Sequence, residues 1–254
     1  MIPKIIHYCW FGGKPKPPLA QKCIDSWKKF CPDYEIREWS EENFDLSTAP
    51  KYVHQAYAAG RWAFVTDYVR LVALVTMGGV YMDTDVEVVK PLDPFLNQKA
   101  FAGFESDKGV QTGLMACESG FPLFRDFLAH YDTAEFIRAD GSHDTTTNVE
   151  VLTRLCVERG LQLNDRYQVV DGLAVYPREY FCPVDFETEK LKRTRKTVTI
   201  HWFSASWHTE EELQFLRQEK ERLRYEKRSN LRVRIGTMVL GEKGYEKLKA
   251  LLKR

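Results

Sequence analysis

The chain has 254 residues, of which 44% are hydrophobic and 13% aromatic, a composition typical of a globular protein with one substantial domain. A formal net charge of +1 argues against a general polyanion binder, and no apolar run reaches the roughly 18 residues that a membrane-spanning helix needs. The six cysteines form no C-x-x-C pair and the N-terminus lacks a signal-peptide pattern, so we expect reduced cysteines in a cytoplasmic protein.

The first predicted elements are those of an α/β fold. Residues 3–10 (PKIIHYCW) read as a strand that two glycines end, and residues 19–30 place apolar side chains near helical spacing. Residues 34–39 (YEIREW) alternate as a half-buried strand does. This order of elements, strand, loop, helix and strand, indicates that the two strands pair in parallel in an α/β sheet.

A strongly apolar helix is predicted at residues 61–77, and Gly78 or Gly79 would supply the left-handed conformation at its C-terminal end. A short strand follows at residues 80–82, and a second extended segment covers residues 86–89. Two aspartates separate these segments, so a buried-looking strand ends in acids.

Shorter strands and two further helices are predicted after the acids. Asn148 or a neighbouring threonine, in the polar run DTTTN, would cap the second of these helices. The predicted strands lie at 101–104, 113–117, 168–170 and 198–203, and the helices at 121–131 and 148–160.

The C-terminal tail differs from the rest in composition. Residues 217–254 contain thirteen Lys or Arg and five Glu, a net charge of +8. The default interpretation is a solvated helical face, and the alternative is attraction to an anionic membrane surface. Nucleic-acid binding is disfavoured because the tail has few aromatic residues and no known motif. We therefore predict a main domain at residues 1–208 and a basic helical extension at 209–254.

Asp83 and Asp85 are the two acids at the end of the strand. Residues two apart in a strand point the same way, and carboxylates close together repel unless a cation lies between them. Mg²⁺ and Mn²⁺ take oxygen ligands and keep positions open for phosphate oxygens, and ligands gather at the strand ends of open α/β sheets. The pair indicates a metal beside a phosphorylated ligand, although two acids in a surface turn would give the same pattern.

Asp67 and Arg70 lie three residues apart on one face of the predicted apolar helix. Charged side chains are rarely buried without a partner. One interpretation is a mutual ion pair that joins the helix to the sheet. The other has Asp67 accepting hydrogen bonds from sugar hydroxyls while Arg70 faces a diphosphate or sugar oxygen.

Three stretches together resemble the family 32 glycosyltransferases. The stretch AFVTDYVRLVALVTMGGVYMDTDVEVVKPLD, within residues 62–95, is similar to their sugar-binding region with a D-x-D motif. IPKIIHYCWFGG, within residues 2–13, is similar to their first strand, and HWFSASW at 201–207 to their C-terminal element. The resemblance implies a GT-A fold, which is a Rossmann-like nucleotide-binding fold with a mixed central sheet, and makes residues 1–208 the catalytic domain.

The resemblance also implies roles for single residues. Asp85 would bind a divalent ion directly, and Asp83 would contact both the ion and the donor. Tyr81 would lie near the ribose or the diphosphate, and Trp10 would stack on the nucleobase unless it is an ordinary core aromatic. The charged pair of the apolar helix would grip the sugar of the donor.

Further expectations concern the C-terminal element and the middle of the chain. His201 would be either another metal ligand or a core histidine with satisfied hydrogen bonds. Ser206 and Trp207 would contact the donor phosphates. Residues 111–113 would face the donor or acceptor sugar, and His7 is interpreted as structural.

The implied activity is transfer of a hexose from a nucleotide sugar, UDP-linked by family frequency, with Mn²⁺ or Mg²⁺ as cofactor and with retention of configuration. The acceptor would be a saccharide or a lipid-linked oligosaccharide in capsular or other polysaccharide biosynthesis, at the inner face of the membrane. No motif supplies a carboxylate nucleophile, so we prefer front-face attack. The alternatives are a non-catalytic protein that binds nucleotide sugars or glycans, and a haloacid-dehalogenase-like phosphatase, against which Glu87 argues because that class has Thr or Val there.

Overall fold

The computed structural model describes residues 1–107, 109–185, 188–204, 214, 218, 221 and 222. The described residues within 1–185 and 191–204 belong to one compact unit, and the architecture below is that of this unit. The predicted basic extension lies almost wholly outside the described residues, so the domain boundary at residue 208 stays a prediction.

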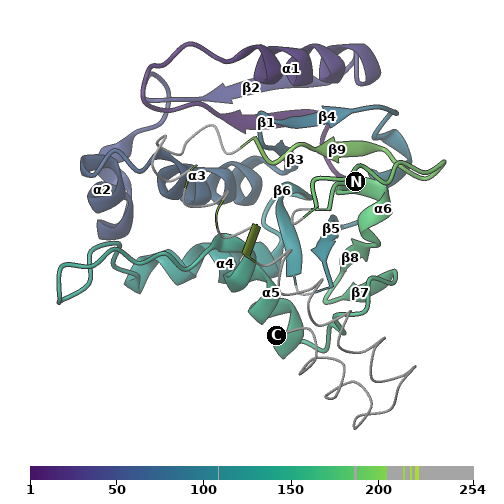
Figure 1. The fold of residues 1–254 in the computed structure, drawn as a ribbon. Coiled ribbons are helices and arrows are strands. Elements are labelled where there is room, and N and C mark those ends of the chain that lie inside the picture. Colours follow the sequence, from purple (N-terminus) through teal and green to yellow (C-terminus); the bar gives the residue numbers. More distant parts are fainter. Residues whose placement is uncertain (108, 186–187, 205–213, 215–217, 219–220, 223–254) are drawn as a thin grey trace, which may run out of the picture. The chain divides into compact units, whose positions relative to one another are not determined.

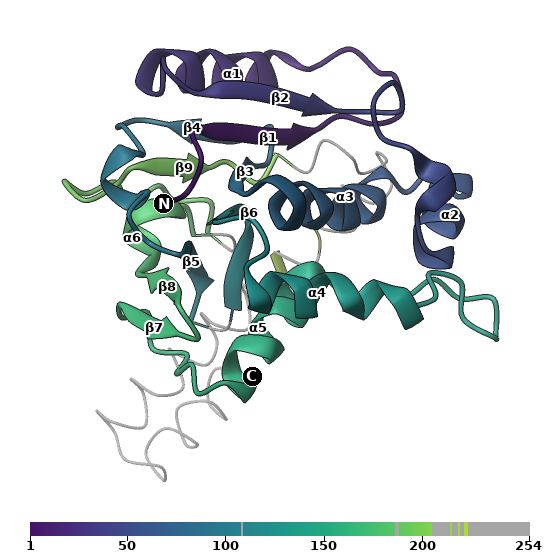
Figure 2. The same cartoon turned by 180° about the vertical axis from the view of Figure 1, so that it is seen from behind.

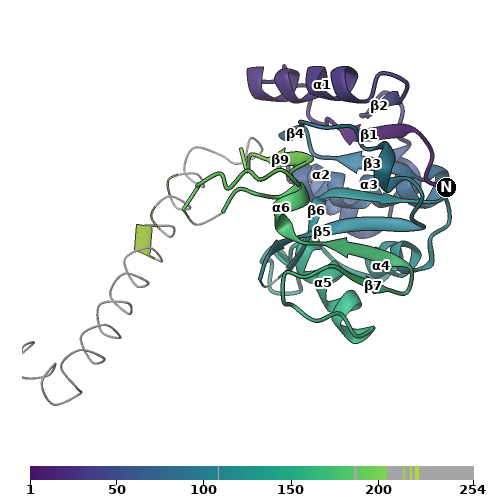
Figure 3. The same ribbon diagram turned by 90° about the vertical axis from the view of Figure 1, so that its right-hand side faces the viewer.

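A mixed sheet of seven strands forms the centre of the described part of the chain (Figure 1). In chain order the strands are β1 (Ile5–Cys9), β2 (Glu35–Trp39), β3 (Gly79–Met82), β5 (Ala100–Ser106), β6 (Gly109–Cys117), β7 (Gln168–Val170) and β8 (Leu173–Tyr176). Their spatial order is β2-β1-β3-β6-β5-β8-β7, which Figure 3 shows running from top to bottom. β1 pairs in parallel with β2 and β3, β5 pairs in parallel with β8, and the other neighbours are antiparallel. The predicted α/β class with a mixed central sheet is thereby confirmed.

Helices cover both faces of the sheet. On one face lie α1 (Pro18–Phe30), α6 (Arg178–Phe181) and a small antiparallel sheet of β4 (Val86–Val88) with β9 (Thr199–His201). The other face carries the remaining α-helices of the described residues, among which α3 and α4 lie side by side in both views (Figures 1 and 2). These are α2 (Lys51–Ala58), α3 (Trp62–Met77), α4 (Pro122–Thr133) and α5 (Asn148–Glu158). Two 3₁₀ turns, Leu46–Thr48 and Asp93–Phe95, complete the assignment.

The β3 strand is buried on both faces, which explains its run of apolar residues. Val80 and Met82 belong to the core under α1, whereas Tyr81 points to the core under α3. Gly78 ends α3 as predicted: its φ is +67°, and its N–H donates to the carbonyl of Leu74 at 2.9 Å. The chain therefore turns sharply from α3 into β3 and delivers the residues that follow to the C-terminal edge of the strand.

Other elements differ from the sequence-based expectations. Helix α2 and strand β8 were not predicted, and the hairpin of β5 and β6 is longer than the predicted strands 101–104 and 113–117. β9 is shorter than the predicted strand 198–203. All six cysteines are buried and unpaired, as expected. Among the described residues, no helix combines the length and apolar character needed to cross a membrane.

Candidate functional site

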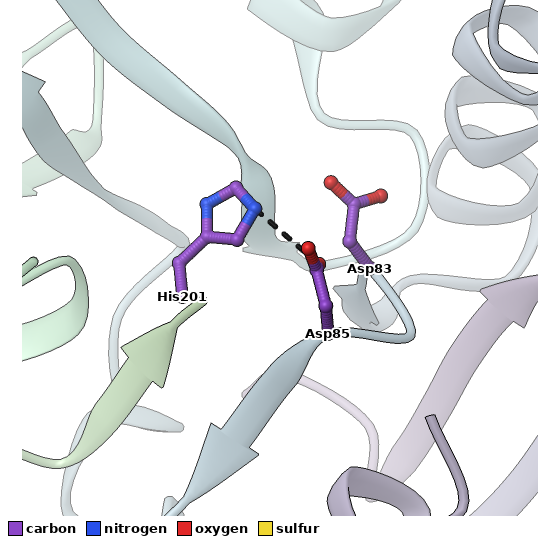
Figure 4. Close-up of side chains that lie close together, drawn as sticks. All are labelled: Asp83, Asp85 and His201. Atoms are coloured by element: carbon purple, nitrogen blue, oxygen red, sulfur yellow. Dashed lines mark ion pairs between the residues drawn. The ribbon is translucent and has the colours of Figure 1, made fainter. Parts of the chain in front are cut away.

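Asp83, Asp85 and His201 converge at the edge of the sheet where β3 ends (Figure 4). The two acids lie in the turn from β3 to β4, and His201 is the last residue of β9. The pairing of β4 with β9 sets Val86 opposite His201, so the imidazole lies beside the second acid. Each residue offers one ligand atom, and these atoms all lie within 4.8 Å of one another. The geometry thus brings together all three residues that were considered as metal ligands from the sequence.

Asp85 and His201 are held by direct contacts. The Nε2 of His201 lies 3.4 Å from Oδ1 of Asp85, and the backbone N–H of Ser204 donates to Oδ2 at 2.7 Å. Burial opposes the charge on Asp85, but His201 and these hydrogen bonds outweigh it and lower the pKa of Asp85 to about 2. Burial likewise opposes the charge on His201, yet Asp85 and then Cys182 raise the pKa of His201 well above its usual value. Without a metal, the two side chains form a buried ion pair.

Asp83 is held from the other side. The hydroxyl of Tyr81 donates to Oδ1 of Asp83 at 2.8 Å, and Nη2 of Arg70 lies 3.5 Å from the same oxygen. The backbone N–H of Asp83 donates to the carbonyl of Gly113 at 2.8 Å. Tyr81 is only 1% exposed, so in this structure it orients Asp83 from the core. Its predicted place near the ribose or diphosphate stays a prediction.

Asp67 and Arg70 form the predicted ion pair, with 2.9 Å between Oδ1 and Nη2. Arg70 also donates from Nη1 to the carbonyl of Thr112 at 3.0 Å and from Nε to the carbonyl of Thr66 at 3.2 Å. Its guanidinium lies over the ring of Tyr81, 4.6 Å from the centroid. Most of the five N–H groups of Arg70 are therefore used within the protein, and the guanidinium balances the charges of the two acids that it contacts.

Gly113 has no side chain, which leaves room for the side chains of His201 and Asp83. A Cβ added there would lie 2.8 Å from Cε1 of His201 and 3.0 Å from Oδ2 of Asp83. The Nδ1 of His201 is buried and has no hydrogen-bond partner in the part of the chain that the structure describes. Two carboxylates and an imidazole suit Mn²⁺ or Mg²⁺, the carboxylates better than the imidazole, so these residues fit the implied metal.

Glu105 and Cys182 interact with the cluster, and Gln111 lies on the same strand as Gly113. Gln111 is fully buried on β6, and neither atom of its amide has a partner among the described residues. Burial raises the pKa of Glu105 at the end of β5, and the charges of His201 and Asp83 also act on this carboxyl. Sequence reasoning named Gln111 only by its position and did not name Glu105 or Cys182, because none of the three stands in a recognisable motif.

Trp10 and His7, which the sequence analysis also singled out, are not part of the cluster. Trp10 follows β1 and is partly buried; its Nε1 donates to the carbonyl of Lys14 at 2.6 Å. His7 is structural as expected, since Nε2 bonds the carbonyl of Gly78 at 2.8 Å and Nδ1 accepts from the indole of Trp39. Ser206 and Trp207 lie outside the described residues.

Comparison with known proteins identifies the region around the acids. Residues 17–102 match the model of the family described as "Glycosyltransferase sugar-binding region containing DXD motif". This span includes Asp67, Arg70, Asp83 and Asp85, and it ends before His201. The predicted resemblance to DXD-containing glycosyltransferases is confirmed.

Curated relatives match about half of this chain. Inositol phosphoceramide mannosyltransferase 3 of Schizosaccharomyces pombe is 34% identical over 128 residues, which are 48% of this chain and 35% of that protein. Mannosyl phosphorylinositol ceramide synthase CSH1 of Saccharomyces cerevisiae is 30% identical over 146 residues, 52% of this chain and 36% of that protein. The matched region thus spans only about a third of each relative's length.

Solved structures resemble the chain more distantly. The PaToxG glycosyltransferase aligns with a TM-score of 0.47 at 19% identity, covering 62% of this chain and 68% of that chain. The galactosyltransferase LgtC aligns with a TM-score of 0.43 at 14% identity, covering 84% and 94%.

Proposed function

Since this chain carries the DXD-containing sugar-binding region of a glycosyltransferase family, we propose that it is a metal-dependent, retaining glycosyltransferase that moves a hexose from a nucleotide sugar to a saccharide or lipid-linked acceptor. The observation that carries the proposal is the convergence of Asp83, Asp85 and His201 beside the buried pair of Asp67 and Arg70. Paired acids at a strand end, with a buried cation behind them, suit a ligand that combines a diphosphate with a sugar.

Two different arguments limit the choice of donor and acceptor. The family resemblance favours UDP as the nucleotide. The names of the relatives favour mannose as the sugar and an inositol-phosphate-bearing ceramide as the acceptor class. UDP-linked hexoses and GDP-mannose therefore belong in one test.

The residues of the cluster would bind the metal, and their neighbours orient them. A divalent ion bound by Asp83, Asp85 and His201 would neutralise charge on the departing diphosphate. Tyr81 and Arg70 fix Asp83, and the N–H of Ser204 fixes Asp85, so the carboxylates are oriented before the ligand arrives.

Asp67 faces the sugar side of this arrangement. Its Oδ1 is occupied by protein donors, and its Oδ2 has no hydrogen-bond partner in the described chain, so Oδ2 remains to accept from sugar hydroxyls. We keep front-face attack by the acceptor hydroxyl as the preferred route to retention. Glu105 is a carboxyl that a covalent route could use, because the charges of His201 and Asp83 act on it and it takes no part in the cluster.

The experiment is a thermal-shift panel of UDP-glucose, UDP-galactose and GDP-mannose, each with and without Mn²⁺. A ligand at 100 times its Kd stabilises the native state by about 2.7 kcal/mol. For a domain of this size that free energy raises the melting temperature by roughly 5–10 °C. One donor should show this shift, and slow Mn²⁺-dependent hydrolysis of that donor would separate a transferase from a lectin, which hydrolyses nothing, and from a phosphatase, which attacks simple phosphomonoesters.

Asp85→Ala tests the site itself. The variant should lose the Mn²⁺-dependent part of the shift, whereas Asp33→Ala, which removes an acid from an exposed ion pair with Lys4, should keep it. An undiminished Mn²⁺ response in Asp85→Ala would remove this residue from the site. No shift with any donor in the unaltered protein would count against the proposed function as a whole.

A cytoplasmic location, peripheral at the inner face of the membrane, belongs to the same proposal. The net charge of +8 in residues 217–254 supports it, because basic segments are attracted to anionic lipid. Co-sedimentation with vesicles that contain phosphatidylserine, compared with neutral vesicles, measures this attraction.

A further inference from the structure

Asn148 is a buried polar residue that helix capping does not explain. It is the first residue of α5 and only 7% exposed. The cap is supplied by its neighbours: the side chain of Thr147 accepts from the N–H of Glu150, and the carboxylate of Glu150 accepts from the N–H of Thr147. The side chain of Asn148 is therefore available for another role.

The amide of Asn148 joins two elements of the site. Its Nδ2 donates to Oδ1 of Asp67 at 2.6 Å, and its Oδ1 accepts from the hydroxyl of Thr112 at 2.8 Å. Arg70 closes the ring, because it pairs with Asp67 and donates to the carbonyl of Thr112. Four residues from α3, β6 and α5 thus form one buried hydrogen-bonded ring.

The chemistry of the ring fixes the orientation of the amide. An ionised carboxylate only accepts hydrogen bonds, so the NH₂ group of Asn148 has to face Asp67 and its oxygen has to face Thr112. Oδ1 of Asp67 then receives two donors, from Asn148 and from Arg70, and the carboxylate cannot rotate without breaking both bonds. Oδ2 of Asp67 is left without a hydrogen-bond partner among the described residues.

We propose that Asn148 is a positioning residue of the transferase: it holds the carboxylate of Asp67 so that Oδ2 receives the hydroxyls of the donor sugar. This inference rests on the proposed function. It concerns the sugar of the donor rather than the metal or the nucleotide, because Asn148 contacts Asp67 and Thr112 but none of the three metal-cluster residues, of which Asp83 is reached only through Arg70 and is also held by Tyr81. Loss of Asn148 should therefore affect the handling of the sugar and leave nucleoside diphosphate binding intact.

The test compares Asn148→Ala and Asn148→Asp with the unaltered protein. We expect kcat/KM for hydrolysis of the active nucleotide sugar to fall about 10- to 100-fold, since loss of a buried charge-assisted hydrogen bond is worth roughly 1.5–3 kcal/mol. The Kd of the matching nucleoside diphosphate with Mn²⁺, measured by calorimetry, should change less than about twofold. Thr147→Ala is the matched control: it weakens the cap of the same helix, lowers the melting temperature, and should leave kcat/KM unchanged.

A double variant that exchanges the side chains of Asp67 and Asn148 serves as the control for misfolding. Asn148→Asp sets a second carboxylate against Asp67, and the double variant Asp67→Asn/Asn148→Asp restores one amide and one carboxylate. The double variant should regain the melting temperature lost by Asn148→Asp without regaining activity, because the carboxylate has moved away from its place.

Three results would overturn the inference. They are full kcat/KM in Asn148→Ala, equal losses of nucleotide-sugar turnover and diphosphate binding in that variant, or recovered activity in the exchanged double variant. Failure of the proposed function looks different, since the unaltered protein itself would then turn over no nucleotide sugar.

Discussion

Gly113→Ala is the substitution that addresses the metal cluster most directly. The backbone of Gly113 does not lie in the left-handed region, so alanine costs nothing in backbone conformation there. The new methyl group would instead lie 2.8 Å from Cε1 and 3.0 Å from Nδ1 of His201, and 3.0 Å from Oδ2 of Asp83. It would stand between two of the three side chains that are proposed to bind the metal.

The size of the effect follows from these distances. Carbon atoms pack at about 3.5–4.0 Å, so the imidazole has to move by about 0.7 Å or more to accept the methyl group. Ligand atoms in a metal site are tolerant to about 0.2 Å, so this shift exceeds what the cluster can absorb. We expect the Kd of Mn²⁺ to rise at least tenfold, which corresponds to about 1.4 kcal/mol.

The assay is titration of the ligand-free protein with Mn²⁺, followed by the electron paramagnetic resonance signal of the free ion. Gly109→Ala is the control, because it adds a methyl group to the same strand, where the neighbours are Val149 Cγ1 at 3.0 Å and Thr153 Oγ1 at 3.4 Å on α5. Both variants should lose stability from overpacking, by about 1–3 kcal/mol. Unchanged Mn²⁺ affinity in Gly113→Ala, or an equal loss in Gly109→Ala, would refute the reasoning.

Two further predictions concern His7 and Glu105. Burial lowers the pKa of His7, so the unfolded chain takes up a proton near pH 6.5 that the folded protein does not, and the free energy of unfolding should fall below that pH by up to about 1.4 kcal/mol per unit. His7→Gln should lose stability at neutral pH but show a smaller decline from pH 7 to 5 in urea titrations, and parallel curves would contradict the assignment. Glu105→Gln should keep at least about a tenth of the donor hydrolysis rate if attack is front-face, whereas a loss of several orders of magnitude, with Mn²⁺ affinity preserved, would favour a covalent route.

The elements nearest to the acids could be predicted because their signals are local. An apolar helix, a glycine with left-handed backbone and a strand buried on both faces follow one another without interruption, and the structure has all three at α3, Gly78 and β3. The hairpin of β7 and β8 also carries a local signal in the sequence. Asp171 and Gly172, with φ of 45° and 85°, form the Asp-Gly turn that joins paired strands, and Val170 pairs with Leu173 across it.

The complete site could not be predicted in this way because it depends on contacts between distant segments. His201 reaches the acids because β9 pairs with β4, and the local residue pattern does not encode that pairing, so His201 was proposed as a ligand only through the family resemblance. Asn148 was interpreted as a possible cap because asparagine is common at helix N-termini, whereas Thr147 performs that role and Asn148 points inward. Residue type alone does not separate the two, since they occupy adjacent positions in one polar run.

The charged pair of α3 shows why both interpretations of a buried charge can hold at once. An unpaired ion in the core would cost several kcal/mol, so Asp67 and Arg70 have to compensate each other whatever else they do. Arg70 meets this requirement with nearly all its donors, which leaves it little to offer a diphosphate. Asp67 meets it with Oδ1 alone, through Arg70 and Asn148, and keeps Oδ2. Under the proposed function, the ion pair that compensates the two buried charges also orients Oδ2 of Asp67 for the ligand, and of the two residues Asp67 is the one with an oxygen left to bind sugar.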